Sequence, residues 1–297
     1  MKTKNFTFLS SFWIKILAFF FMTLDHIGYA NEMFLGNSNL SIFRVLGRLA
    51  LPLFAFMIAE GAIHTKNMPK YLLRLGIMGT VIAIAFLGLE YLPIFEGMSM
   101  WGAGNIFMDL ALGALAIYCL RNKNWYIKLL SLLPIAIAFA SFIANTLERG
   151  GDVGQIWWFP FFLRCQYDWY SVIMIVGFYL CYLLKDVILK AQESTTGIKY
   201  ESIKDSQIDR LLTNILQAFV VIFMTLLLHL CGTYWLPSDY VYWMQGVSNW
   251  AMLSGAFILL YSGKRGYNAK WFQYGGYLYY PLHMVLIFGI YYLYMFL

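Results

Sequence analysis

The sequence predicts an all-α, polytopic integral membrane protein with about nine transmembrane helices and a short re-entrant or interfacial segment. Of its 297 residues, 61% are hydrophobic and only 12% are charged, whereas soluble domains carry about 25% charged residues. Aromatic residues make up 19% of the chain, and many tryptophans lie near the ends of apolar runs, as in the interfacial belts of membrane proteins. These observations exclude a large soluble core.

Nine apolar runs are each close to the length of about 20 residues that a membrane-spanning helix needs. They cover residues 11–30, 41–63, 71–93, 105–121, 125–146, 168–189, 212–231, 240–261 and 271–295. The stretch 156–165 is too short to cross alone, and its Pro160 favours an interfacial or re-entrant segment. If this stretch did cross, the topology of all later spans would be inverted.

Basic residues alternate between successive loops and set the predicted orientation. Lysine and arginine gather before the first span, after the second, fourth and sixth spans, and before the last span. Because such loops stay in the cytoplasm, we predict a multi-pass protein of the bacterial cytoplasmic membrane with a cytoplasmic N-terminus and an external C-terminus. These loops account for the net charge of +6, so no nucleic-acid partner is predicted.

The start of the chain resembles a signal peptide, with lysines before an apolar run and small residues near Ala30. The apolar run is longer than that of a signal peptide, and cleavage at Ala30 would remove Asp25 and His26. We therefore expect a retained first span, with cleavage as the alternative.

The long polar stretch 190–211 predicts a cytoplasmic linker within a single domain of residues 1–297. It separates a six-helix front part from a three-helix back part. No internal repeat is visible, although transporters built on inverted repeats show one. The four cysteines have no metal-ligand spacing, so no metal site is predicted.

Ionisable residues inside the spans mark the candidate site, because a charge at membrane depth costs about 2.5–3.5 kcal/mol on insertion scales. Asp25 and His26 lie in the outer half of the first span, and Arg44 and Arg48 lie one helical turn apart in the second. Further such residues are Lys15, Glu60, Asp109, His229 and His283. Charged groups at a similar depth from at least three spans predict an enclosed polar pocket.

These groups also have structural interpretations. Asp25 and His26 can hydrate at the outer end of a helix, and the two arginines can snorkel to the interface. His283 can form a hydrogen bond between helices, and a structural role is the better interpretation of His229.

His26 is the candidate general base, because imidazole takes a proton near neutral pH and a carboxylate can orient it. Consecutive helical residues point about 100° apart, so either Asp25 or the more distant Asp109 can supply that carboxylate. The predicted catalytic residues are His26, Asp25, Asp109 and His283. Arginines nearby would stabilise an anionic substrate or a developing oxyanion.

Lys15 lies eleven positions before His26, about 16 Å along a helix. A cation near the cytoplasm and a deep base suit a long donor whose phosphates stay at the surface. The glycine-flanked loop 263–266 is a second candidate phosphate contact, although an ordinary positive-inside loop explains it equally well. The predicted binding residues are Lys15, Arg44, Arg48, Glu60, Lys264 and Arg265.

Several motifs resemble the TraX family of polytopic membrane proteins. They include Asp25-His26-Ile27-Gly28, Arg44-Val45-Leu46-Gly47-Arg48, Ala59-Glu60-Gly61, Asn105-Ile106-Phe107, Gly263-Lys264-Arg265-Gly266 and Tyr280-Pro281-Leu282-His283. The resemblance runs from about residue 13 to 287 and is weakest through 130–210.

The resemblance implies acyl transfer. TraX proteins are named for N-acetylation of conjugative pilin, and they resemble larger transmembrane acyltransferases that modify envelope glycans with acyl-CoA. In the acyltransferase-3 relatives, a basic residue, ten residues and a catalytic histidine occupy the first span, a pattern that Lys15 and His26 resemble. Lysine stands here where arginine is usual, and it lacks the bidentate guanidinium fork.

The leading prediction is therefore a membrane-embedded acyltransferase that uses cytoplasmic acetyl-CoA. The acceptor would be a hydroxyl or amine of an envelope glycan, a lipid-linked sugar or a surface polypeptide. A proton-coupled transporter is the alternative, and a non-catalytic assembly partner is a third interpretation. The acceptor, the acyl chain length and the oligomeric state stay open.

Overall fold

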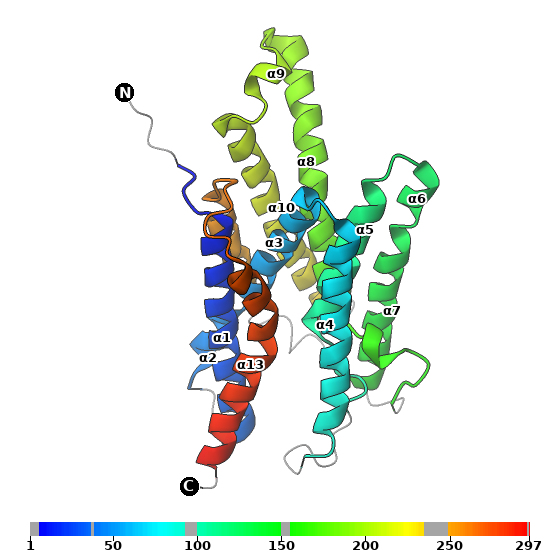
Figure 1. The fold of residues 1–297 in the computed structure, drawn as a ribbon, viewed down its shortest axis with the longest axis vertical. Coiled ribbons are helices and arrows are strands. Elements are labelled where there is room, and N and C mark those ends of the chain that lie inside the picture. Colours follow the sequence, from blue (N-terminus) through cyan, green and yellow to red (C-terminus); the bar gives the residue numbers. More distant parts are fainter. Residues whose placement is uncertain (1–5, 37–38, 93–99, 150–154, 235–248, 296) are drawn as a thin grey trace. The chain divides into compact units, whose positions relative to one another are not determined.

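The computed structural model describes residues 6–36, 39–92, 100–149, 155–234, 249–295 and 297. These ranges are all-helical, as predicted, and contain no β-strand. Two isolated bridges join Leu9 to Tyr261 and Asn105 to Cys165. Figure 1 shows the helices.

The described helices vary widely in length. In chain order they are α1 (Ser11–Leu35), α2 (Ser41–Gly47), α3 (Ala50–His64), α4 (Met68–Leu89), α5 (Ile106–Leu120), α6 (Trp125–Leu129), α7 (Leu132–Arg149), the 3₁₀ helix η2 (Phe161–Leu163), α8 (Asp168–Thr196), α9 (Tyr200–Ile203), α10 (Gln207–Tyr234), the 3₁₀ helix η3 (Asn249–Leu253), α12 (Ser254–Leu259) and α13 (Lys270–Tyr294). Six helical segments are long and apolar enough to cross a membrane: Ser11–Leu35, Ser41–His64, Met68–Leu89, Trp125–Glu148, Asp168–Thr196 and Gln207–Tyr234.

The six segments are fewer than the nine predicted spans. Helix α5 has 15 residues, which gives about 22 Å of helix against a hydrocarbon core of about 30 Å. The run 240–261 is described only from Asn249, where it forms η3 and α12. Helix α13 has 25 residues, but its many tyrosines and glycines dilute its apolar character. Each of the nine apolar runs nevertheless contains helix in its described part.

The chain packs into two compact units, and the division does not follow the order along the chain. Unit 1 comprises residues 1–57, 180–229 and 244–297, and unit 2 comprises 58–179 and 230–243. The stretch 190–211 lies in unit 1 and contains the end of α8, helix α9 and the start of α10. Unit 1 therefore unites the first predicted span with the last one.

In unit 1, α1 and α13 lie side by side and run in the same direction (Figure 1). Ring contacts follow the pair from one end to the other: Phe12 to Phe272 at 4.9 Å, Phe19 to Tyr279 at 4.6 Å and Phe34 to Tyr291 at 6.1 Å between centroids. Positions on the two helices therefore keep a nearly constant offset. This register decides which polar groups meet.

Helix α2 is separated from α3 by a short break at Arg48 and Leu49. The N–H groups of these two residues donate to carbonyls three positions back, at 3.3 Å and 3.1 Å, which is the 3₁₀ pattern. Pro52 follows in the first turn of α3 and has no N–H for the carbonyl of Arg48. The predicted second span is therefore two helical pieces, with Arg48 at their junction.

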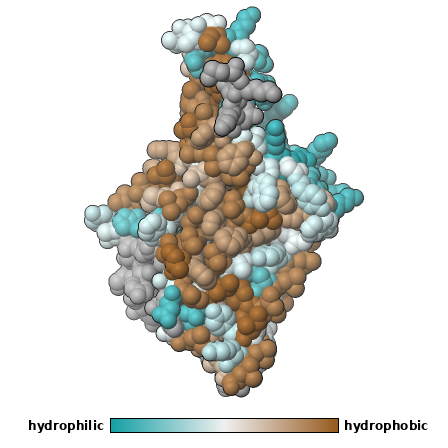
Figure 2. Space-filling view, turned by 90° about the vertical axis from the view of Figure 1, so that its left-hand side faces the viewer, coloured by the Kyte–Doolittle hydropathy of each residue, from teal (hydrophilic) through white to brown (hydrophobic). Residues whose placement is uncertain are grey.

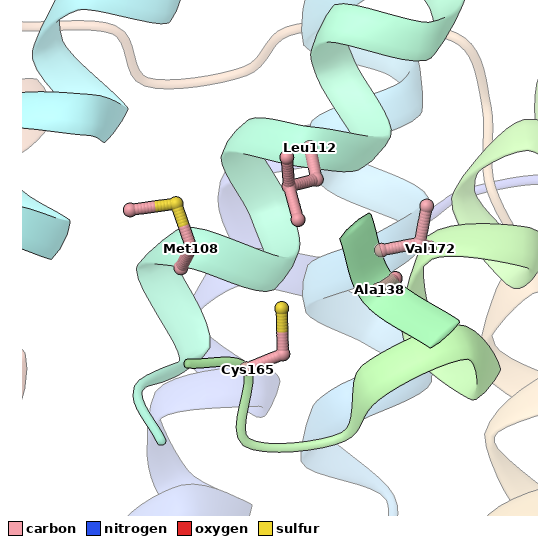
Figure 3. Packing of buried hydrophobic residues seen from close by; sticks show 5 residues of the cluster. All are labelled: Met108, Leu112, Ala138, Cys165 and Val172. Carbon is pink, nitrogen blue, oxygen red and sulfur yellow. The ribbon is translucent and has the colours of Figure 1, made fainter. Parts of the chain in front are cut away.

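Unit 2 has an apolar core between α5, α7, α8 and the loop before α8. Figure 3 shows its central residues, namely Met108, Leu112, Ala138, Cys165 and Val172. Gly113 lets α5 approach α8 closely, because a Cβ at this position would lie 2.6 Å from Cδ1 of Ile175. The core holds the helix ends that carry the polar groups of this unit.

Large apolar side chains also cover much of the outside of the protein. Leu73 on α4 is 61% exposed and Val285 on α13 is 73% exposed, and hydrophobic residues occupy most of the face seen in Figure 2. Such a surface is unfavourable in water and suits contact with lipid. This apolar surface and the six apolar helices together indicate a membrane protein.

Candidate functional site

Asp25 on α1 forms ion pairs with two arginines in unit 1. Its Oδ1 lies 2.8 Å from Nη1 of Arg44 and 2.8 Å from Nη2 of Arg48. The three side chains are 12%, 11% and 6% exposed. Charge-assisted hydrogen bonds of this kind are about twice as strong as neutral ones. The structure thus pairs the opposite charges that the sequence placed at one depth.

Two glycines allow this close approach of α1 and α2. A Cβ at Gly47 would lie only 2.2 Å from Cβ of Asp25, and a Cβ at Gly28 would lie 3.0 Å from Cδ of Arg44. Any side chain at position 47 would therefore push Asp25 away from its partners. Glycine is needed here for space, since neither position has a positive φ angle.

His26 pairs with His283 across the contact between α1 and α13. Nδ1 of His26 lies 2.7 Å from Nε2 of His283, and Nδ1 of His283 lies 2.8 Å from the carbonyl oxygen of Tyr279. The His26 ring also forms a backbone hydrogen bond with Met22, one turn earlier on α1. The partner of the predicted base is therefore a second imidazole.

Aromatic rings hold the imidazole of His283 in place. The Tyr279 ring stacks on it with centroids 5.1 Å apart and an interplanar angle of 8°, and Tyr280 meets it edge-on at 5.8 Å. The Tyr279 hydroxyl lies 2.6 Å from Oγ1 of Thr23. Thr23 donates its own proton to the carbonyl of Phe19, so Tyr279 is the donor to Thr23. These contacts tie α13 to α1 beside the histidine pair.

Lys15 lies on α1 toward its N-terminal end. Its Nζ lies 5.4 Å from the ring centroid of Phe272 on α13, which is within cation–π range. Among the described residues, Lys15 has no ion pair or side-chain hydrogen bond with an acid. Its charge is therefore available to an anionic ligand.

The backbone of the loop 263–266 caps the first residues of α1. The N–H groups of Ser11 and Phe12 donate to the carbonyls of Lys264 and Arg265, at 2.8 Å and 3.1 Å. These bonds satisfy backbone donors that every helix start leaves unpaired. The flanking Gly263 and Gly266 have φ angles of 73° and 69°, which glycine adopts without strain.

The side chains of Lys264 and Arg265 are exposed. The loop thus has a structural function through its carbonyls, while the exposed side chains of Lys264 and Arg265 are accessible to another partner. In the described part of unit 1, Lys15 follows the capped start of α1 by one helical turn. The structure accordingly brings the three predicted phosphate contacts to the same end of α1.

Asp109, a predicted catalytic residue, lies in unit 2 on α5 and is fully buried. Its carboxylate accepts hydrogen bonds from the N–H groups of Gln166 and Tyr167, at 2.6 Å and 3.0 Å, and from the Ser171 hydroxyl at 2.6 Å. These partners lie just before and inside the first turn of α8. Asp109 therefore fixes the entry into α8.

Arg164 is a fully buried cation of unit 2 that the sequence analysis did not select. It forms a bidentate ion pair with Glu148, at 2.8 Å and 3.0 Å, and donates to Asn145 Oδ1 at 2.9 Å and to the carbonyl of Ile156 at 3.1 Å. Asn145 in turn donates to both oxygens of Asp168, at 3.1 Å. The network anchors the short segment 156–165 to α7 and α8.

Sequence reasoning missed this network because Arg164 lies in a segment too short to be counted as a span. A signal was present, since Arg164 is an isolated charge in the otherwise apolar stretch 156–165. Glu60, a predicted binding residue, is buried on α3 and also belongs to unit 2. In the described part of the chain, no group of three or more metal-binding side chains comes together.

The fold and the site define a polytopic membrane protein with buried, hydrogen-bonded ionisable groups inside its apolar helices. The chain belongs to the TraX family: the family model, described as TraX protein, matches residues 10–196. The matched range includes Lys15, Asp25, His26, Arg44 and Arg48. His283 and the loop 263–266 lie beyond it.

A curated relative is the probable fimbrial assembly protein FimC, serogroup H1, of Dichelobacter nodosus. It is 33% identical over 138 residues, which are 44% of this chain and 54% of the relative. The match therefore spans about half the length of that protein. No solved structure matches the chain.

Proposed function

We propose that the protein is a pilus-associated membrane acyltransferase that transfers an acetyl group from acetyl-CoA to a hydroxyl or amine. The observation that carries the proposal is the arrangement on α1, where an unpaired Lys15 and a hydrogen-bonded His26 lie about 16 Å apart. Membership of the TraX family and the fimbrial name of the relative support it. A surface polypeptide such as a pilus subunit is the favoured acceptor, with an envelope glycan or lipid-linked sugar as the other classes.

His26 acts as the general base in this proposal. It takes the proton of the acceptor hydroxyl or amine while the acceptor's lone pair attacks the thioester carbonyl carbon. The carbon–sulfur bond then breaks, and His26 returns the proton to the departing thiolate. The products are the acetylated acceptor and the free thiol of coenzyme A, so protons and electron pairs balance without an acyl-enzyme.

Arg44 and Arg48 support the charge that develops on the carbonyl oxygen. Both guanidinium groups are held by Asp25, Nε of Arg44 lies 3.5 Å from Oε2 of Glu32, and Nε of Arg48 donates to the carbonyl of Arg44 at 3.4 Å. Because Asp25 fixes both arginines before substrate arrives, little reorganisation is needed during the reaction. The proposed role of Asp25 is therefore to position the two arginines. The group that contacts His26 is His283, where the sequence analysis expected a carboxylate.

The donor would bind with its phosphates at the N-terminal end of α1. Lys15, Lys264 and Arg265 supply three cations there, and an extended pantetheine arm would carry the thioester to His26. Phosphate contacts of this kind are largely electrostatic. Holding both reactants in one enclosed site makes the transfer effectively unimolecular.

The proposal includes an orientation in the bacterial cytoplasmic membrane. Nine crossings would place the N-terminus, the stretch 190–211 and the loop 263–266 in the cytoplasm, where acetyl-CoA is made available. The basic residues of these loops support this orientation. Acceptor would then reach His26 from the outer half of α1.

The test uses the purified protein reconstituted in lipid vesicles with labelled acetyl-CoA. We expect saturable binding of acetyl-CoA and transfer of the label to pilus subunits or to an envelope fraction, identified by mass spectrometry. Vesicles without protein serve as the control. Absence of both binding and transfer would contradict the proposal and favour the proton-coupled transporter.

A further inference from the structure

The hydrogen bonds around the histidine pair fix the positions of its protons. The carbonyl oxygen of Tyr279 can only accept, so Nδ1 of His283 must carry a proton to form the bond of 2.8 Å. In a neutral imidazole the other nitrogen is then an acceptor. Nε2 of His283 therefore accepts the bond from His26.

The same logic determines the tautomer of His26. Its Nδ1 lies 2.7 Å from Nε2 of His283 and must donate, because the latter nitrogen has no proton. In neutral His26 the remaining nitrogen, Nε2, is then unprotonated. Both hydrogen bonds are thus donated in the same direction: His26 donates to His283, and His283 donates to the backbone of α13.

From this chain of donors we infer that His283 is a positioning residue, which holds His26 in the tautomer whose Nε2 is the reacting atom. The tautomer is inferred from geometry alone. Its catalytic consequence rests on the proposed function. Tyr279 restrains the His283 ring by stacking at 5.1 Å and provides the carbonyl that accepts from Nδ1 of His283. Tyr279 thereby fixes the orientation of the His283 ring and the positions of the protons in the His26–His283 pair.

The bond also has a consequence after proton transfer. When His26 gains a proton on Nε2, its Nδ1–H stays bonded to neutral His283, which shares the positive charge. A hydrogen bond to a charged donor is stronger than one between neutral groups, and a buried environment strengthens it further. His283 therefore does for His26 what a carboxylate does in other catalytic dyads.

The tautomer is measured directly by magnetic resonance on purified protein with isotope-labelled histidine. The chain has 4 histidines, so single substitutions assign each signal. Ring nitrogen shifts separate protonated from unprotonated nitrogens, and we expect His26 to be protonated at Nδ1 and bare at Nε2. A His26 ring protonated only at Nε2 would overturn the inference, whatever the activity of the protein.

The role of His283 is tested with a conservative pair of variants. In His283→Leu the acceptor on α13 is lost and the bond to the Met22 backbone is the one left to His26, so we expect a larger share of the other His26 tautomer. Acetyl transfer should fall at least about tenfold, since a wrong tautomer costs up to about 10⁴-fold in serine proteases. In His283→Gln the amide oxygen can accept from Nδ1, so we expect the tautomer and most of the transfer rate to return.

The outcomes separate this inference from the proposed function. Equal transfer rates in the Leu and Gln variants at matched thermal midpoints would refute the positioning role, while transfer by the unmodified protein would still support the function. Absence of transfer by unmodified protein with the expected tautomer would refute the function and, with it, the catalytic consequence assigned to His283.

Discussion

The two units each bury a cluster of charged groups, and the clusters differ in how completely their partners satisfy them. In unit 2, Arg164 uses four hydrogen bonds and Asp109 accepts three. In unit 1, Asp25 is paired, but Lys15 has no acid partner among the described residues and the neutral His26 retains a basic nitrogen. Nε of Arg164 has no hydrogen-bond partner within the described part of the chain, but its charge is paired with Glu148 and holds the structure together. A cation or a basic nitrogen that is not paired with an acid can act on a ligand.

The difference in hydrogen-bond partners assigns different roles to carboxylates that have the same charge. Asp109 and Asp25 are both carboxylates inside apolar helices, and each was a reasonable candidate from sequence. The partners of Asp109 are backbone N–H groups before α8 and a hydroxyl, which indicates a structural function. Changes at the paired groups, Arg164 in unit 2 and Asp25 in unit 1, should therefore affect stability, and changes at Lys15 and His26 should affect binding or transfer.

The largest effect on stability is expected from Arg164→Ala. Removing this fully buried cation leaves Glu148, whose side chain is 18% exposed, without its bidentate partner, and breaking a buried pair costs about 3–5 kcal/mol. We expect a much lower thermal midpoint and reduced abundance in the membrane. Lys123→Ala, at an exposed position of unit 2, is the control and should change stability by no more than about 0.5 kcal/mol. Equal midpoints for both variants would remove the structural role of Arg164.

A smaller loss of stability is expected from Asp25→Asn. The amide keeps the shape of the side chain but removes the charge that Arg44 and Arg48 share, and Arg44 keeps only its longer contact to Glu32 at 3.5 Å, at a cost of about 1.5–3 kcal/mol. Adding Arg48→Gln removes one of these cations, so the double variant should be less destabilised than the sum of the single changes. Strict additivity of the midpoint shifts would show that Asp25 and Arg48 are not coupled.

The smallest effect is expected from Lys15→Ala, which should raise KM for acetyl-CoA about tenfold, or about 1.4 kcal/mol, with kcat little changed. Lys15→Arg keeps the charge and should stay close to the unmodified protein. Lys70→Ala, an exposed lysine of unit 2, is the matched control. An unchanged KM in Lys15→Ala would place the donor phosphates elsewhere.

The sequence predicted the helical class and the polar groups on α1 and α2 well, for a physical reason. Charges inside apolar runs are conspicuous, and two arginines one turn apart must share a helix face. Asp25 could therefore be matched with Arg44 and Arg48 by depth. The count of nine spans was less secure, because length and hydropathy alone do not decide whether α5 or α13 crosses.

Depth could not identify the remaining partners. His26 and His283 are 257 positions apart, and only the parallel packing of α1 and α13 brings them together. Asp109 has a similar predicted depth, but the chain folds into two units and places it in the other one. The role of Arg164 was missed because its segment is held by tertiary contacts to Glu148 and Asn145, and no local pattern reveals those partners.

The central claim is that His26 is the general base of an acetyl-transfer site in unit 1. The direct measurement is the rate of acetyl transfer by purified His26→Ala and by the control His229→Ala, whose imidazole bonds to Asn249 at 3.3 Å. Both are compared with the unmodified protein at matched amount and thermal midpoint. The account predicts a loss of about 10²–10⁴-fold for His26→Ala and a near-normal rate for His229→Ala. A near-normal rate in His26→Ala would contradict it.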